Sequence, residues 1–163
     1  MSYKNKTYII FDADTDMKYY RLMTAWKANE NIDFNFHNAH DLNNLRDGSQ
    51  EETIKRRLRE RMNNTKQVIV LVGDSTKFLY KFVRWEIEIA LNMDIPVIAV
   101  NLNKLNNAHS KTPPILTKNS YFVSVPLEIK KIKYALDNFP GEYTREKHQA
   151  PSSRTYDWNK CSL

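Results

Sequence analysis

The chain has 163 residues, 41% of them hydrophobic, and a formal net charge of +6, which suits one globular domain. No apolar run approaches the roughly 20 residues of a membrane span, and the start of the chain lacks the apolar region of a signal peptide, so we expect a cytoplasmic protein with no membrane partner. The single cysteine, Cys161, excludes an internal disulfide and forms no recognisable zinc pattern with the four histidines, so we expect no metal.

Strand-like and helix-like segments alternate along the chain. We predict strands at residues 7–11, 33–36, 68–72, 96–100 and 121–125. We predict helices at residues 16–29, from residue 49 onward, at 78–92 and at 127–138. Buried strands that alternate with helices are typical of a parallel sheet with helices on both faces. The expected fold class is therefore α/β, with a five-stranded parallel sheet.

The sheet domain is expected to span residues 1–139. The stretch 101–120 contains Pro113 and Pro114 and shows no clear helical period, so we expect one irregular crossover. Residues 140–163 follow as a polar tail with scattered aromatic residues, which either wraps around the domain or is disordered.

Three polar loops follow the carboxyl ends of predicted strands, where ligands bind in sheets of this kind. They are residues 12–15, 37–48 and 73–76. The chain has only three glycines, Gly48, Gly73 and Gly141, which excludes both a phosphate-binding P-loop and a GxGxxG dinucleotide fingerprint. Any nucleotide must therefore be held in another way.

Asp12, Asp14 and Asp16 have the spacing of the start of a calcium-binding loop. The pattern fails further along, because Met17 stands where glycine is needed and Met23 where a bidentate glutamate is needed. Asp16 is more simply the N-cap of the first helix. Asp12 and Asp14 remain candidates for contact with a ligand.

Glu86 is the most informative residue, because it is a carboxylate on the apolar side of a helix. At about 100° per residue, the apolar stripe of the segment 78–92 consists of Leu79, Val83, Ile87 and Ala90. Glu86 falls near the middle of this stripe, whereas Glu88 falls on the opposite, solvated side. Burying an unpaired carboxylate costs several kcal/mol, so Glu86 must be neutralised, paired or left facing a cleft. The pattern alone leaves two interpretations, a structural carboxylate or a catalytic group.

Basic residues gather in two of the predicted helices. They are Lys55, Arg56, Arg57, Arg59 and Arg61 in one, and Lys130, Lys131 and Lys133 in the other. Such residues can attract nucleic acid or an anionic ligand. Aromatic residues do not interleave with these charges as a stacking platform requires, so we expect two solvated helix faces and no nucleic-acid partner.

Four segments together resemble the TIR-like family, and most closely its bacterial and archaeal branch, which includes the TIR subunit of Thoeris anti-phage defence. These segments are residues 10–14, Trp26, residues 70–76 and residues 82–87, and the resemblance covers about residues 6–136. Its most specific part is the string of an aromatic residue, a valine, two further residues and a glutamate, which here runs from Phe82 to Glu86. Many TIR domains have tryptophan at the first position of this string, where the chain has Phe82.

The resemblance implies a flavodoxin-like fold and cleavage of the bond between nicotinamide and ribose in NAD+. The family's catalytic glutamate matches Glu86. Residues that would contact the substrate are Phe11, Asp12, Ala13, Asp14, Ser75 and Phe82. The loop 37–48 matches the mobile loop that gates the site and mediates self-assembly. NAD+ would be the substrate, no further cofactor is implied, and a cyclic ADP-ribose isomer would activate a separate effector protein.

Three other functions compete with this one. A TIR-like domain without catalysis would act as an assembly or adaptor module. A receiver-like phosphoacceptor would need an aspartate at the end of the third strand and a lysine at the end of the fifth, but Asp74 lies beyond Gly73 and the fifth strand ends at Ser124 and Val125. A nucleic-acid binder rests on the charge alone, and steep salt dependence of binding would support it.

Overall fold

The computed structural model describes residues 6–29, 35–37, 50–79 and 81–163. Its sheet has the strand order β2-β1-β3-β4-β5-β6, and every neighbouring pair is parallel. The strands are β1 (Lys6–Ile10), β2 (Asn35–His37), β3 (Gln67–Val72), β4 (Val97–Asn101), β5 (Tyr121–Pro126) and β6 (Ser152–Thr155). The predicted α/β fold with a parallel sheet is confirmed. The sheet has a sixth strand that the sequence analysis did not predict.

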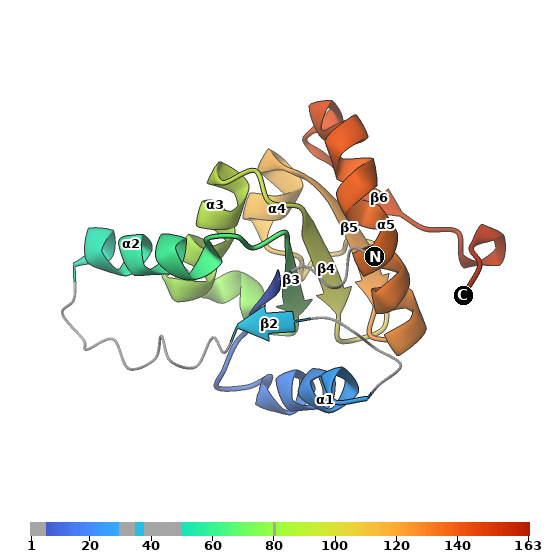
Figure 1. Cartoon of the computed structure of the whole chain (residues 1–163), viewed down its shortest axis with the longest axis horizontal. Coiled ribbons are helices and arrows are strands. Elements are labelled where there is room, and N and C mark those ends of the chain that lie inside the picture. The colour runs from blue at the N-terminus through green and yellow to red at the C-terminus, as the bar shows by residue number, and fades with distance from the viewer. Residues whose placement is uncertain (1–5, 30–34, 38–49, 80) are drawn as a thin grey trace.

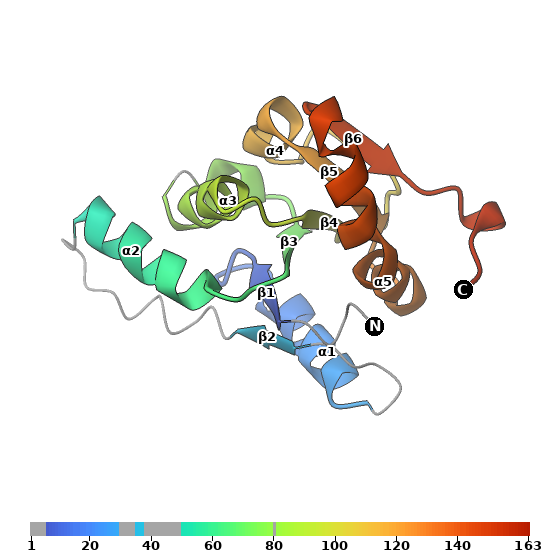
Figure 2. The ribbon, with the colours of Figure 1, turned by 45° about the horizontal axis from the view of Figure 1, so that its top comes forward.

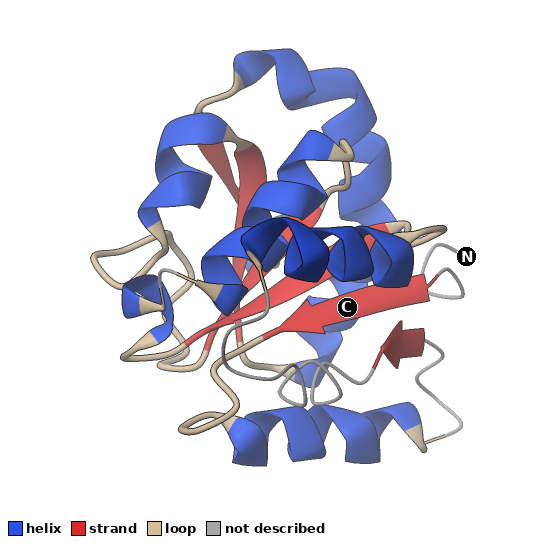
Figure 3. Cartoon of the chain, turned by 90° about the vertical axis from the view of Figure 1, so that its left-hand side faces the viewer, coloured by secondary structure: helices blue, strands red, loops and turns tan. Residues whose placement is uncertain are grey.

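The helices cover both faces of this sheet, as Figures 2 and 3 show. They are α1 (Met17–Lys27), α2 (Glu51–Met62), α3 (Phe82–Asn92), α4 (Pro114–Asn119) and α5 (Ile129–Glu146). Alternate residues of a strand point to opposite faces. Ile9 and Ile69 therefore join the core beneath α1 and α5, whereas Tyr8 and Val68 join the core beneath α2, α3 and α4. Among the described residues, no helix is long and apolar enough to cross a membrane.

The predicted strands and the first three predicted helices agree with this structure to within a few residues where both are described. Residue 49, where the second helix was expected to begin, lies outside the described residues, and α2 has Gln50 as its N-cap. Residues 33 and 34 of the second expected strand also lie outside them, as do residues 38–48 of the expected mobile loop.

The crossover between β4 and β5 contains α4, although no helix was expected there. Pro114 occupies the first turn of α4, where a missing backbone N–H costs nothing. Six residues are too few to show a helical period, so the sequence did not predict this helix.

The last helix extends well beyond its expected end at residue 138, because α5 runs through Pro140 to Glu146. Interior proline usually breaks a helix, since it removes one backbone hydrogen bond. Packing on both sides of Pro140 outweighs this loss: Phe139 is fully buried, and its ring lies 6.2 Å from that of Tyr143. The expected domain boundary after residue 139 therefore falls inside a continuous helix.

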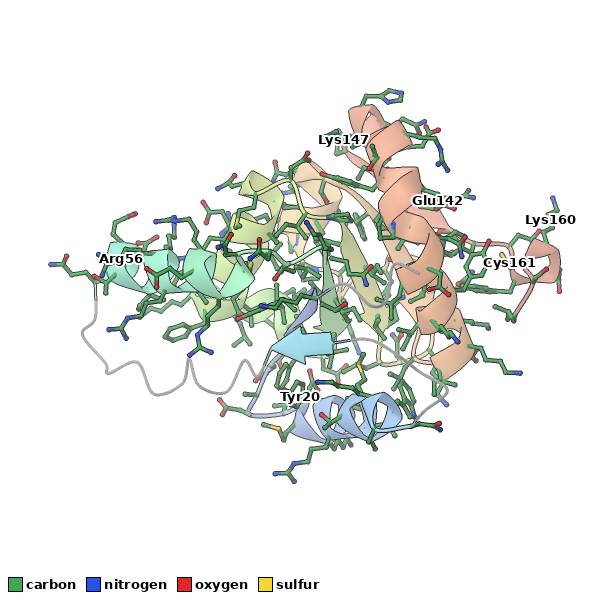
Figure 4. All side chains as sticks on the ribbon, in the orientation of Figure 1. Tyr20, Arg56, Glu142, Lys147, Lys160 and Cys161 are labelled. Carbon is green, nitrogen blue, oxygen red and sulfur yellow. The ribbon has the colours of Figure 1, made fainter. Side chains whose placement is uncertain are left out.

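The segment after α5 returns to the sheet and pairs with β5. Three contacts of its aromatic residues fix it: the Tyr156 hydroxyl donates to Glu142 Oε2 (2.7 Å), Trp158 Nε1 donates to Asn106 Oδ1 (2.7 Å), and Asn106 Nδ2 donates to the Tyr156 carbonyl (3.1 Å). Figure 4 shows Glu142 on the outer part of α5, with Lys160 and Cys161 at the far end of the tail. The described tail is thus tied to both α5 and the loop after β4.

Candidate active site

Glu86 lies on the second turn of α3, which follows β3 and packs against the sheet. Val83, Ile87 and Ala90 of the predicted stripe are buried, and Glu86 is buried among them with 5% of its surface exposed. Glu88 lies on the outer side of α3 and its carboxylate is 3.5 Å from Lys55 Nζ. The helical pattern therefore placed both carboxylates correctly.

Two residues from other elements act on the Glu86 carboxyl group. Burial raises the pKa of Glu86 from 4.5 to about 8, while a hydrogen bond from the Tyr8 hydroxyl and the positive charge of Arg61 act in the opposite direction. Burial and Glu86 itself raise the pKa of Tyr8 far above neutrality, so the phenol stays protonated and remains a donor. The carboxyl group thus lies between β1, α2 and α3.

One oxygen of this carboxyl group, Glu86 Oε2, is buried and has no hydrogen-bond partner of ordinary geometry in the described part of the chain. A buried carboxyl group with its pKa near 8 is mostly neutral at pH 7. A positive charge brought beside it would favour its ionised form, because opposite charges attract strongly in a poorly hydrated environment.

The loop between β1 and α1 forms a second polar cluster, centred on Asp12. Ser75 Oγ and Thr15 Oγ1 both donate to Asp12 Oδ2, at 2.5 and 2.8 Å, and the Asp14 amide donates to Asp12 Oδ1 at 3.0 Å. Burial alone would raise the pKa of Asp12, but these hydrogen bonds outweigh it and hold the pKa below its ordinary value. Asp12 is therefore an ionised carboxylate that ties the loop after β1 to the loop after β3.

The side chains of the other site candidates pack against hydrophobic residues and not against the Asp12 carboxylate. The Phe11 ring stacks on Tyr20 of α1 at 4.6 Å and is buried on the sheet face opposite to Glu86. Ala13 packs against the same α1-side core. Phe82, at the start of α3, is 36% exposed and makes an edge contact with Trp85 at 5.7 Å.

A family model described as the TIR-like domain of the Thoeris protein ThsB matches residues 8–107. The chain belongs to the ThsB TIR-like family. The match runs from β1 into the loop after β4, so it includes Glu86 and the Asp12 cluster but neither α5 nor β6. Membership of this family gives the chain a role in Thoeris anti-phage defence.

Within this TIR-like domain, the expected site residues fall into two groups. Asp12, Asp14 and Ser75 come together at the carboxyl ends of β1 and β3, as expected. Glu86 forms no hydrogen bond or ion pair with them in the described part of the chain. Residues 38–48 of the loop between β2 and α2 lie outside the described residues, so the structure does not place them against either group.

Sequence reasoning missed three residues of these groups, Tyr8, Thr15 and Arg61. Tyr8 could have been noticed, because it places a polar hydroxyl group in the apolar strand 7–11. Arg61 was assigned to a solvated basic face, although its charge acts on Glu86 from the last turn of α2. Among the described residues, no group of three or more His, Cys, Asp or Glu side chains is arranged to hold a metal ion.

Proposed function

We propose that the chain is an enzyme that cleaves the bond between nicotinamide and ribose in NAD+. Its product would be a cyclic ADP-ribose isomer that activates a separate effector protein in anti-phage defence. The observation that carries this proposal is Glu86, a buried carboxyl group on the apolar side of α3, at the position that the family resemblance assigns to the catalytic glutamate. NAD+ serves as the substrate, and no further cofactor takes part.

One carboxylate suffices for this reaction. Nicotinamide departs as a neutral molecule from a positively charged pyridinium, so the leaving group needs no acid. The ribose passes through an oxocarbenium-like state, as in glycoside hydrolysis. A fixed negative charge beside that ribose stabilises the developing positive charge, and it is most effective where water is excluded.

The raised pKa of Glu86 fits such a role. The free enzyme holds this carboxyl group mostly neutral at pH 7, since its pKa is about 8. The positive charge of the NAD+ pyridinium would lower that pKa, so substrate binding would ionise the carboxyl group when the reaction needs it. The Tyr8 hydroxyl would then hold one carboxylate oxygen while the other faces the ribose.

The ribosyl cation is then captured by a nucleophile. Water would give ADP-ribose, whereas a nucleophile of the same molecule would give a cyclic isomer and one of another molecule would give base exchange. We expect activity to depend on self-assembly through the loop 37–48, as the family resemblance implies.

The products formed from NAD+ test this proposal. Purified protein at high concentration is incubated with NAD+, and the products are separated by chromatography and weighed by mass spectrometry. We expect free nicotinamide and a co-product that has the mass of ADP-ribose less one water, which marks cyclisation. Absence of nicotinamide, both with purified protein and in lysate from phage-infected cells, would contradict the proposal.

A non-catalytic assembly or adaptor module is the alternative. The observation in its favour is that Glu86 is buried beside Tyr8 and Arg61, where a structural carboxylate could also lie. A structural role requires that loss of the Glu86 charge destabilises the fold. The catalytic role requires the opposite.

A further inference from the structure

A small polar cavity lies at the carboxyl ends of β3 and β4, on the α1 side of the sheet. Figure 1 shows these two strands pointing toward α1. The cavity has a volume of about 170 Å³, and its lining includes Asp16, Gly73, Asp74, Asn103 and Lys111. Carboxyl ends of strands are where ligands bind in open α/β sheets. Glu86 lies in the core on the other face of the sheet, so this cavity is separate from the proposed catalytic carboxylate.

Asp16 is the unusual residue of this cavity. It occupies the N-cap position of α1, as predicted, but its side chain forms no capping hydrogen bond. The carboxyl group instead lies against Gly73, where only 6% of the residue is exposed. Its Oδ2 atom is buried and has no hydrogen-bond partner in the described part of the chain.

The charges around Asp16 favour a positively charged ligand. The carboxylates of Asp12, Asp16 and Asp74 lie close enough to interact, whereas the ammonium groups nearby are those of Lys18 and Lys111. Asp74 is exposed and pairs with the Lys111 ammonium group at the rim of the cavity. Lys111 thus already acts as a counter-ion for one of the two carboxylates.

The size of the cavity limits the ligand. A volume near 170 Å³ corresponds to about six water molecules at roughly 30 Å³ each, too little for a nucleotide. Carboxylate oxygens suit hard cations, and Mg²⁺ keeps most of its waters when one or two carboxylates hold it. A site with fewer than three acidic side chains is therefore sufficient for such an ion.

We propose that this cavity binds a hydrated divalent cation of the Mg²⁺ or Ca²⁺ type through Asp16 Oδ2 and the Asp74 carboxylate. Lys111 competes with the cation for Asp74, because both need the same oxygens. Water supplies the remaining ligands. The sequence predicts no metal, because it has no zinc pattern, the spacing of its aspartates does not match a calcium-binding loop, and the contribution of Asp74 appears only in the folded chain.

Calorimetric titration of the full chain with MgCl₂ and with CaCl₂ tests this proposal without NAD+, so it stands or falls separately from the proposed function. We expect dissociation constants on the order of 0.1–1 mM for the unmodified protein. Asp16→Asn should weaken binding at least about tenfold, since it removes the buried charge. Lys111→Met should strengthen binding by a few fold, because Asp74 then has no competing partner.

Asp14→Asn is the matched control. It removes the same charge from the same loop, but Asp14 is exposed and outside the cavity. Its effect on binding should stay within about twofold, because solvent screens exposed charges. Mn²⁺ should broaden the amide NMR signals of Gly73 and Asn103 first.

Three results would overturn the proposal. They are no binding at about 10 mM cation, well above the expected range, equal weakening by Asp14→Asn and Asp16→Asn, or binding that Lys111→Met leaves unchanged. If Asp16→Asn fails to fold, the Lys111→Met titration decides alone, because Lys111 is at the rim and its loss leaves the buried carboxyl group in place.

Discussion

The carboxyl group of Glu86 experiences opposing influences in the folded protein. Burial favours its neutral form, whereas Tyr8 and Arg61 favour its ionised form, and burial is the largest of the three. A group in this position costs folding free energy whenever it must ionise. Such a cost is expected where a site is organised for a ligand that arrives with the opposite charge.

Stability should therefore fall with rising pH because of Glu86. Below pH 4.5 the Glu86 carboxyl group is neutral in both the folded and the unfolded chain, so its burial does not lower the free energy of unfolding. As the pH rises toward the folded-state pKa of about 8, the unfolded chain ionises more readily than the folded one. The free energy of unfolding then falls by an amount on the order of 4 kcal/mol. Glu86→Gln should raise the thermal unfolding midpoint at pH 8 by several degrees and leave it unchanged near pH 4.5.

Glu88→Gln is the control for this comparison, because Glu88 lies on the outer side of the same helix. It should change the midpoint little at either pH. A Glu86→Gln variant that is less stable than the unmodified protein at pH 8 would support the structural role instead.

Tyr8→Phe should shift the pH dependence of nicotinamide release. Removing the phenol hydroxyl takes away a hydrogen bond that lowers the pKa of Glu86, so that pKa should rise above 8. In a plot of kcat/KM against pH, the rising limb reports ionisation of Glu86 in the free enzyme. This limb should move to higher pH by up to about one unit. A profile that keeps its position while its height falls would show that Tyr8 serves packing alone.

At the residue scale, Glu86 was predictable because a carboxylate interrupts the 3.6-residue period of an apolar stripe. Its partners were not, because Tyr8 and Arg61 approach from β1 and α2, which no local pattern relates to α3. Phe11 shows the same limitation. The family resemblance implies that it contacts the substrate, whereas in the structure its ring stacks on Tyr20 of α1.

At the element scale, hydrogen bonds of Thr76 and Ser75 hold the connection from β3 to α3 in place. Thr76 Oγ1 donates to the Leu71 carbonyl at 3.1 Å and accepts from the Gly73 amide at 2.9 Å, while Ser75 reaches Asp12. Gly73 permits the close approach of Asp16. A Cβ atom there would lie 2.9 Å from Asp16 Oδ1 and closer still to Oδ2.

Gly73→Ala should therefore destabilise the protein by about 1–3 kcal/mol, because either the loop or α1 must move. Gly141→Ala provides the matched comparison. Gly141 lies inside α5, and the nearest atom to an added Cβ is Arg145 Nη1 at 3.7 Å. That change should stabilise the protein by about 0.5–1 kcal/mol, as alanine favours a helix. Urea denaturation measures both values, and equal effects from the two changes would contradict this account of Gly73.

The arrangement of the whole molecule depends on its last strand. β6 covers the edge of β5, and Tyr156 lies 3% exposed between α5 and the loop after β4. An uncovered strand edge is a template for pairing with other chains. The residues after α5 thus contribute to the core and also protect the sheet.

Removal of residues 150–163 should lower stability by about 3–5 kcal/mol and promote aggregation, because it uncovers β5 and removes a buried tyrosine. A shorter deletion of residues 162 and 163 is the control and should change the unfolding midpoint by no more than about 2 °C, because both residues are exposed. Circular dichroism and light scattering follow the two effects. An unchanged midpoint in the longer deletion would mean that β6 is dispensable.

At this scale the sheet was predictable, because fully apolar strands alternate with helices along most of the chain. β6 was not, because its residues are polar and half-exposed, and an edge strand of four residues leaves no hydrophobic pattern. The extension of α5 through Pro140 was also hidden, since it depends on packing against distant residues rather than on local preference.

Nicotinamide release from NAD+ by Glu86→Gln, beside the unmodified protein and Glu88→Gln, tests the central claim most directly. We predict release by the unmodified protein and by Glu88→Gln, and a loss of at least about 10³-fold in Glu86→Gln, because one fixed charge at the reacting ribose is removed. Release by Glu86→Gln at a rate close to that of the unmodified protein would show that this carboxylate does not carry the reaction.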